Sequence, residues 1–149
     1  IYITTPYLVI DNEMVTALCV AAKSGIDVRI ITPSIPDKKL INEVTKSYYD
    51  QLMESGVRIY EYLPGFIHAK TFIVDDEYAT VGTVNLDYRS LYLHFENGVW
   101  LYKAKVIDKI KNDFLETLKK SKEVKLSEIK LTKLQRLKRQ ILMAFAPLM

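Results

Sequence analysis

The chain has 149 residues and a mass of 17.2 kDa, a length typical of one domain. Its 49% hydrophobic and 26% charged residues exclude a disordered or collagen-like protein. The single cysteine, Cys19, cannot form an internal disulfide, which excludes a disulfide-stapled scaffold and favours a reducing compartment. Because the sequence begins with Ile inside a predicted strand, we expect a longer polypeptide around it.

The net charge of +3 is divided unevenly along the chain. Residues 1–102 carry 8 Lys and Arg against 13 Asp and Glu, whereas residues 103–149 carry 13 against 5. A basic C-terminal segment of this kind indicates an anionic partner, either a nucleic acid or a phospholipid surface.

The first half of the chain alternates between predicted strands and helices. Runs of β-branched residues predict strands, and apolar residues at helical spacing predict helices. Asp11 is expected to cap the first helix and Gly25 to end it. The elements are a strand at residues 1–4, the helix between Asp11 and Gly25, a strand at 26–32, a helix at 37–54 and a strand at 57–63. Such repeats imply right-handed crossovers and parallel strands.

The pattern changes after this alternation. Residues 68–74 and 78–83 are predicted to form a hairpin across a polar turn, and a further strand is predicted at 97–102. A helix at residues 103–121 follows. Together these elements predict the α/β class, with a mixed, mainly parallel sheet and helices on both of its faces.

The C-terminal segment, residues 122–149, is predicted as a basic amphipathic helix after a domain of residues 1–121. The helical pattern is clearest from Ser127 onward. Its apolar stripe comprises Leu131, Leu134, Leu137, Ile141, Phe145 and Leu148, and the basic residues around it are Lys130, Lys133, Arg136, Lys138 and Arg139. Two interpretations are open: the helix lies on an anionic membrane, or the stripe packs on its own domain.

The residues with the clearest chemical potential are His68 and Lys70. Two positions apart in a predicted strand, their side chains leave the same face of the sheet. An imidazole can attack a phosphate while an ammonium neutralises its oxygens. The hairpin would bring Thr83 and Asn85 alongside, and Glu96 could accept the other imidazole N–H of His68. The set predicts phosphate chemistry without a metal or another cofactor.

The spacing of these residues resembles the signature of the phospholipase D superfamily. That signature is His-x-Lys, four residues, Asp, six residues and Gly-(Ser/Thr)-x-Asn, and residues 68–85 match it with Asp75 in the aspartate position. Residues 3–7, 25–28, 85–90 and 146–149 extend the resemblance to the C-terminal half of bacterial cardiolipin synthases. Asp75 joins the candidate catalytic set by this match, although its place in the predicted turn favours a structural role.

The resemblance assigns a role to each candidate residue. His68 would form a phosphohistidine or act as an acid and base, and Lys70 would bind the phosphate. Thr83 and Asn85 would complete the phosphate pocket, and Glu96 would orient the histidine.

The sequence departs from the family pattern at two points. His94-Phe95-Glu96 stands where many cardiolipin synthases have Asn-Phe-Glu. In addition, the family's active site uses two His-x-Lys motifs across a pseudo-twofold interface, whereas one is present here. The second motif is therefore expected from an N-terminal half or from a second copy in a homodimer.

The resemblance implies phosphatidyl transfer that condenses two phosphatidylglycerols to cardiolipin and glycerol, at the cytoplasmic side of the cell membrane. The expected partners are phosphatidylglycerol and an anionic membrane surface rather than nucleic acid. Two alternatives are a phospholipase D or nuclease that hands the phosphoryl group to water, and an inactive binding module.

Overall fold

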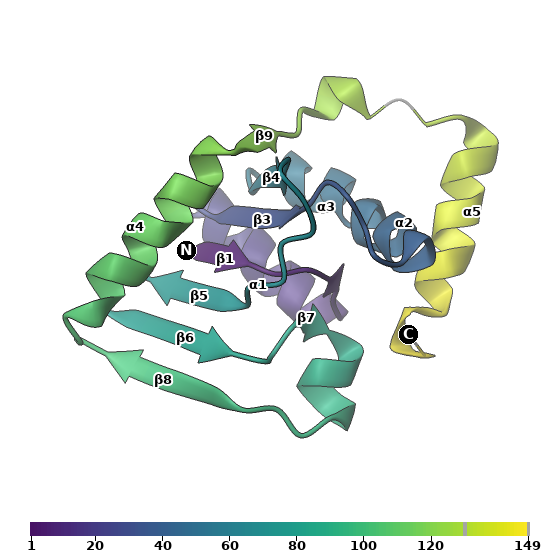
Figure 1. Ribbon diagram of the computed structural model, residues 1–149. Coiled ribbons are helices and arrows are strands. Elements are labelled where there is room, and N and C mark those ends of the chain that lie inside the picture. The colour runs from purple at the N-terminus through teal and green to yellow at the C-terminus, as the bar shows by residue number, and fades with distance from the viewer. Residues whose placement is uncertain (130, 149) are drawn as a thin grey trace.

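The computed structural model describes residues 1–129 and 131–148 and shows an α/β fold built around a central sheet (Figure 1). The seven strands are β1 (Tyr2–Thr4), β3 (Arg29–Pro33), β4 (Arg58–Tyr62), β5 (Thr71–Val74), β6 (Tyr78–Gly82), β8 (Gly98–Tyr102) and β9 (Ser121–Glu123). Their order across the sheet is β8-β6-β5-β1-β3-β4-β9. Lys130, one of the predicted basic residues, and Met149 lie outside the described residues.

The sheet is mixed, and its two parts follow from the two sequence patterns. β1, β3 and β4 pair in parallel, as the strand–helix–strand repeats predict. β5 joins β1, β6 joins β5 and β8 joins β6 by antiparallel pairing, which continues the predicted hairpin. The predicted α/β class with a mixed sheet is therefore confirmed. The expectation of a mainly parallel sheet is wrong, because two of the six pairings between the described strands of this sheet are parallel and four are antiparallel.

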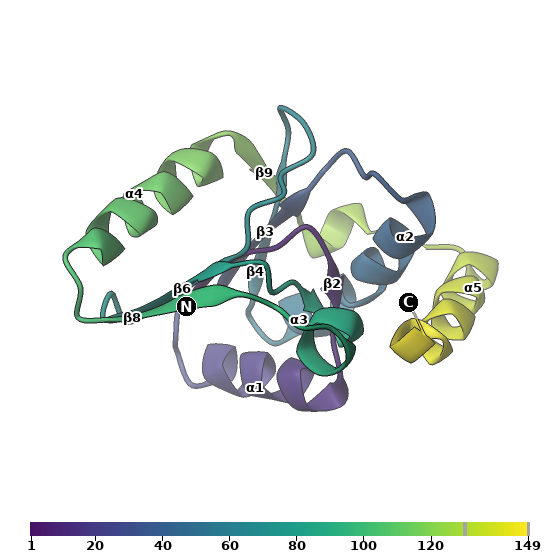
Figure 2. The same ribbon diagram turned by 60° about the horizontal axis from the view of Figure 1, so that its bottom comes forward.

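Helices cover both faces of the sheet, as predicted (Figure 2). α1 (Asn12–Lys23), α2 (Lys39–Ser47) and α3 (Tyr49–Glu54) contribute to one apolar core, which contains Ile3, Ile30 and Ile59 of the sheet. α4 (Val106–Lys119) covers the other face, where Phe114 packs in a second core with Ile31 and Ile73. Asp11 caps α1 as expected, accepting a 2.8 Å hydrogen bond from the Met14 amide.

One predicted helix is divided in the structure. Residues 37–54 form α2 and α3, and Tyr48 lies between them. The Tyr48 amide donates to the Thr45 carbonyl, three residues back, so the turn tightens there and the helix is interrupted. The side chain of Tyr48 is buried in the core, which fixes this break in place.

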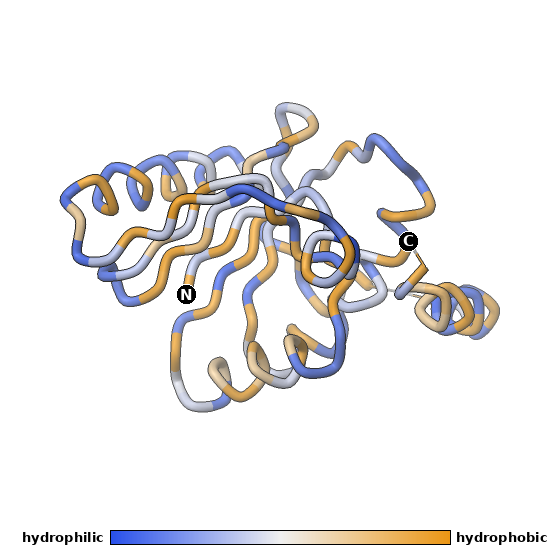
Figure 3. Tube along the Cα trace, turned by 90° about the horizontal axis from the view of Figure 1, so that it is seen from below, coloured by the Kyte–Doolittle hydropathy of each residue, from blue (hydrophilic) through white to orange (hydrophobic). Residues whose placement is uncertain are grey.

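The C-terminal segment also differs from the prediction of one helix. β9 pairs with the edge of β4, and a short 3-10 turn, Leu126–Glu128, follows it. α5 (Lys133–Ala144) begins only at Thr132, whose side chain forms a capping box with Gln135. α5 packs on α2 and lies apart from the sheet (Figure 3). Within the described residues, no helix has the length and apolar character needed to cross a bilayer.

Candidate active site

His68 lies on the loop between β4 and β5, at the end of the sheet where β1 ends. Its side chain is exposed, and its ring is tilted against Phe66 with 5.6 Å between ring centroids. Phe66 in turn contacts Tyr7, at 6.4 Å. The predicted strand 68–74 begins its ladder only at Thr71, so His68 and Lys70 precede β5 instead of lying within it.

Lys70 is buried, and its ammonium is held by the backbone of the motif. Nζ donates a 2.7 Å hydrogen bond to the carbonyl oxygen of His68. Burial lowers the pKa of Lys70 below its usual 10.5, and the negative charges of Glu96 and Asp87 oppose that shift. An ammonium has three donors, so two remain for a ligand.

Thr83, Ser90 and Glu96 form a hydrogen-bonded cluster beside Lys70. The Thr83 hydroxyl donates to Glu96 Oε2, and the Ser90 hydroxyl donates to Glu96 Oε1 at 2.7 Å. Because the single Ser90 proton goes to Glu96, its oxygen is free to accept the 3.1 Å bond from Asn85 Nδ2. The Thr83 and Ser90 hydroxyls together hold the pKa of Glu96 below its usual 4.5.

The structure brings together Thr83, Asn85 and Glu96, but it does not join Glu96 to His68 as predicted. The hydrogen bonds of the Glu96 carboxylate among the described residues go to the two hydroxyls. Glu96 therefore fixes the side chains of the pocket. Among the described residues no hydrogen bond joins it to the imidazole, so its role in orienting His68 stays a prediction. Ser90 links Asn85 to Glu96 by hydrogen bonds to both. From the sequence alone, Ser90 has no role of its own and belongs only to residues 85–90, which resemble cardiolipin synthases.

Asp75 is separated from the other candidates. It lies in the turn after β5, with φ at 52°, and Asp76 follows it at 59°. The Glu77 amide donates to the Val74 carbonyl at 3.1 Å, which closes the turn. Since β5 has four residues, roughly 13 Å of strand separates this turn from Lys70. A catalytic contact by Asp75 is wrong for this geometry, and its role as a turn residue fits it.

Short pairings far apart in the sequence hold the site loops. β2 (Leu8–Val9) pairs in parallel with β7 (Leu86–Asp87). The buried Thr5 hydroxyl oxygen also accepts a 3.1 Å hydrogen bond from the Leu86 amide. After β7, Asp87 accepts a 2.7 Å bond from the Ser90 amide and starts the π-helical turn Arg89–Leu93. These contacts place Asn85 and Ser90, one on each side of β7.

A cavity of about 280 Å³ adjoins the cluster. Asn85, Ser90 and Asp87 line one side, and Lys38 and Ile41 at the start of α2 line another. Asn85 and Ser90 thus belong both to the hydrogen-bonded cluster and to the cavity wall. Asn85 Oδ1 is buried and has no hydrogen-bond partner among the described residues, so it can accept a bond from a ligand.

Comparison with known proteins identifies relatives of this fold and sequence. Residues 1–118 match the family described as cardiolipin synthase, PLD-like domain. Cardiolipin synthases of Halalkalibacterium halodurans and of a Geobacillus species are 42% and 48% identical to the chain over 130 and 124 residues, or 87% and 83% of it. The chain spans only 26% and 25% of the length of these two relatives.

Two solved structures share the fold. Nuc from Salmonella typhimurium, a phospholipase D family member, superposes with a TM-score of 0.71 at 18% identity, over 83% of this chain and 80% of its own. The phosphatidylserine synthase of Haemophilus influenzae gives 0.74 at 19% identity, over 99% of this chain and 39% of its own. Because the family model covers most of the sequence, including the span from His68 to Asn85, the chain belongs to the family of cardiolipin synthase PLD-like domains.

Proposed function

We propose that this chain carries one half of an active site that transfers a phosphatidyl group through a phosphohistidine. The observation that carries the proposal is the buried Lys70 ammonium, hydrogen-bonded to the backbone of His68 and adjacent to the Thr83–Glu96–Ser90–Asn85 cluster. A cation and amide held in place before substrate arrives lower the cost of the charge that develops on phosphoryl oxygens. The relatives named cardiolipin synthase support this choice of reaction.

The proposed reaction has two displacements at phosphorus. A histidine nitrogen attacks the phosphodiester of one phosphatidylglycerol, the bond to the glycerol headgroup breaks, and glycerol leaves with a proton from the histidine of a second motif. The hydroxyl of a second phosphatidylglycerol then attacks the phosphohistidine, returns a proton to that second histidine and releases cardiolipin. Lys70 and Asn85, which both keep unused N–H donors, hold the phosphoryl oxygens in each step.

The cavity beside the cluster offers a place for the attacking alcohol. Lys38 and Arg89 lie at its wall, are exposed, and are in no ion pair within the described chain. Asn85 Oδ1, buried without a partner there, can accept the bond of a hydroxyl. A second phosphatidylglycerol brings both a hydroxyl and an anionic phosphate, which suits this combination of groups.

The second motif would dock at the β8 edge of the sheet, brought by an N-terminal half or by a second copy. β8 is an edge strand of five residues, with Val99 and Trp100 exposed, and Phe95 just before it is fully exposed. This apolar edge directly follows Glu96, so a partner seated on it reaches the site. The opposite edge, β9, is only three residues long and carries Lys122 and Glu123, which disfavours pairing there.

The function is tested by expressing the complete reading frame around residues 1–149 and incubating it with phosphatidylglycerol vesicles at the cytoplasmic pH. We expect cardiolipin and glycerol as products. His68→Ala should lower turnover by roughly 10³-fold or more. Its circular dichroism should stay unchanged, because the His68 side chain is exposed. Lys109→Ala, on an exposed position of α4, is the matched control. Formation of phosphatidic acid in place of cardiolipin would show that the reaction is hydrolysis and would refute the proposed transfer. Full activity of His68→Ala would overturn the proposed mechanism.

The partner edge has its own test. Val99→Lys puts a charge on the β8 edge and should reduce both activity and association measured by sedimentation velocity. Ile35→Lys is the control, because the two side chains are 58% and 55% exposed. Activity of the 149-residue chain alone as a dimer would assign the second motif to another copy, and activity only in the longer reading frame would assign it to the N-terminal half. Equal loss in both variants would refute the assignment of this edge.

A further inference from the structure

Helix α5 and the turn after it carry an apolar stripe that nothing in the described chain covers. Leu134, Leu137, Ile141 and Phe145 follow at helical spacing and are 77%, 52%, 52% and 52% exposed. Leu148, in the 3-10 turn Ala146–Leu148, is 75% exposed. These five residues are called the α5 stripe below. Soluble proteins rarely expose a continuous apolar patch, and those that do commonly use it for interaction.

A different face of α5 attaches the helix to its own domain. Leu142 and Met143 pack against the main core, and Arg139 Nη1 donates a 3.3 Å hydrogen bond to the Lys46 carbonyl on α2. At 3.6 residues per turn Arg139 and Met143 lie away from the α5 stripe, whereas Leu142 borders it. The interpretation in which the stripe packs on its own domain is therefore wrong for its five members, whereas Leu131 is half-buried.

The charge around the α5 stripe favours an anionic partner. Lys133, Arg136 and Lys138 are exposed on the same helix, and none of them is in an ion pair within the described residues. The sequence has no Asp or Glu after Glu128. A second copy pairing through the same helix would bring like charges together, so charge complementarity argues against that occupant.

We propose that the α5 stripe seats the domain on an anionic phospholipid surface. The five apolar side chains would enter the boundary between headgroups and acyl chains, and Lys133 and Lys138, on the two sides of the stripe, would lie at the lipid phosphates. Such binding combines apolar burial with electrostatic attraction, so it depends on both lipid charge and salt. This inference stands on α5 alone and does not require the chemistry proposed for His68.

The test is co-sedimentation of the 149-residue chain with vesicles. We expect binding to vesicles of equal parts phosphatidylglycerol and phosphatidylcholine, weakening as salt is raised, and little binding to phosphatidylcholine alone. The triple variant Leu134→Gln, Leu137→Gln, Ile141→Gln should bind roughly tenfold more weakly or worse. A matched triple variant, Val20→Gln, Ile35→Gln, Leu126→Gln, alters apolar residues that are 57%, 55% and 43% exposed elsewhere and should bind like the parent.

A second variant separates the two contributions. Lys133→Gln, Arg136→Gln, Lys138→Gln leaves the apolar stripe intact and should also weaken binding to the anionic vesicles. His68→Ala should bind as the parent does, which keeps failure of the catalytic proposal distinct from failure of this one. Three results would overturn the inference: parent-like binding by the first triple variant, equal binding to neutral vesicles, or a dimer in sedimentation velocity that only the first triple variant dissolves.

Discussion

At the residue scale, the site is organised around a carboxylate rather than around the histidine. Glu96 receives hydroxyl bonds from Thr83 and Ser90, and Ser90 passes the network on to Asn85. The pocket side chains are therefore fixed before any ligand binds, whereas His68 is exposed and is held mainly by its backbone bond from Lys70. In the proposed mechanism, this arrangement suits a nucleophilic His68 that must meet the phosphorus atom directly beside donors already in place.

The Glu96 network makes a prediction for Ser90. Ser90→Ala removes the donor to Glu96 Oε1, so the pKa of Glu96 should rise towards 4.5 in a carbon-13 NMR titration. A carboxylate whose pKa is lowered by folding stabilises the folded state at pH values above its pKa in the unfolded chain. That stability is lost as the pH falls through its pKa in the folded protein. The variant should therefore lose less stability on acidification. Ser47→Ala, whose hydroxyl binds the Glu43 carbonyl, is the control, and an unshifted Glu96 pKa in Ser90→Ala would contradict the network.

At the element scale, the close approach of β6 and β8 depends on Gly82. A Cβ added at Gly82 would meet the Asn97 carbonyl oxygen at 2.3 Å and the Gly98 Cα at 2.5 Å, both of them backbone atoms. The same two strands lead directly into Thr83 and Glu96, so the glycine of the motif has a packing role in addition to its place in the signature.

Substitution of the two facing glycines tests this packing. Gly82→Ala should cost about 1–3 kcal/mol in the free energy of unfolding by denaturant, because the strands must separate. Gly98→Ala should cost much less, since its Cβ would lie 3.6 Å from the Val81 carbonyl oxygen, an ordinary contact distance. Equal costs for the two variants would remove the close approach as the reason for glycine at position 82.

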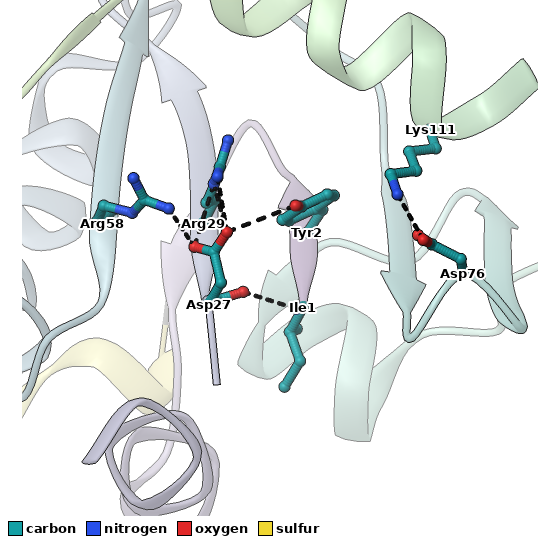
Figure 4. A network of polar contacts seen from close by, with 7 residues as sticks. All are labelled: Ile1, Tyr2, Asp27, Arg29, Arg58, Asp76 and Lys111. Carbon is teal, nitrogen blue, oxygen red and sulfur yellow. Dashed lines mark hydrogen bonds and ion pairs between the residues drawn. The ribbon is translucent and has the colours of Figure 1, made fainter. Parts of the chain in front are cut away.

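At the scale of the whole molecule, Asp27 joins the parallel strands at the end of the sheet remote from the site (Figure 4). Its carboxylate binds Arg29 of β3, at 2.7 Å from Nη2, and Arg58 of β4. Burial alone would raise the pKa of Asp27, but the bonds from Arg29 and Arg58 lower it to about 2. The carboxylate thus stays charged at neutral pH.

Acid unfolding should reveal this ion-pair network. Asp27 contributes stability that is complete above about pH 4 and is lost as pH falls through its folded pKa of about 2. Because the side chain is 39% exposed, solvent screening limits the effect to about 1 kcal/mol or less. In Asp27→Asn the free energy of unfolding should depend less on pH between about 2 and 4, and Asp50→Asn is the control. An unchanged pH profile in Asp27→Asn would show that the pairs add nothing.

The sequence predicted the strands and helices that have a repeating residue pattern, and it missed the features that depend on individual long-range contacts. Runs of β-branched residues predicted β1, β3, β4 and the hairpin, because branched side chains pack well in strands. The pairing of β2 with β7 joins two residues to two others 78 positions away, and no local pattern encodes it. The same holds for β9, a polar strand formed only because the β4 edge is available. In the site, the residue spacing predicted that Thr83 and Asn85 lie close together. It did not predict the hydrogen bond from Ser90 to Glu96, because no periodic pattern distinguishes Ser90 from its neighbours.

The position of β1 in the middle of the sheet governs how any covalent neighbour can reach the chemistry. Ile1 lies beside Asp27 at one end of the sheet. Lys70 lies at the opposite end, just beyond the pair formed by Thr4 and Thr71. A polypeptide entering at Ile1 must therefore travel back along the strands, roughly 15 Å or more, before it can touch the imidazole. The N-terminal end of β1 and the imidazole thus lie at opposite ends of the sheet, a span of roughly five extended residues.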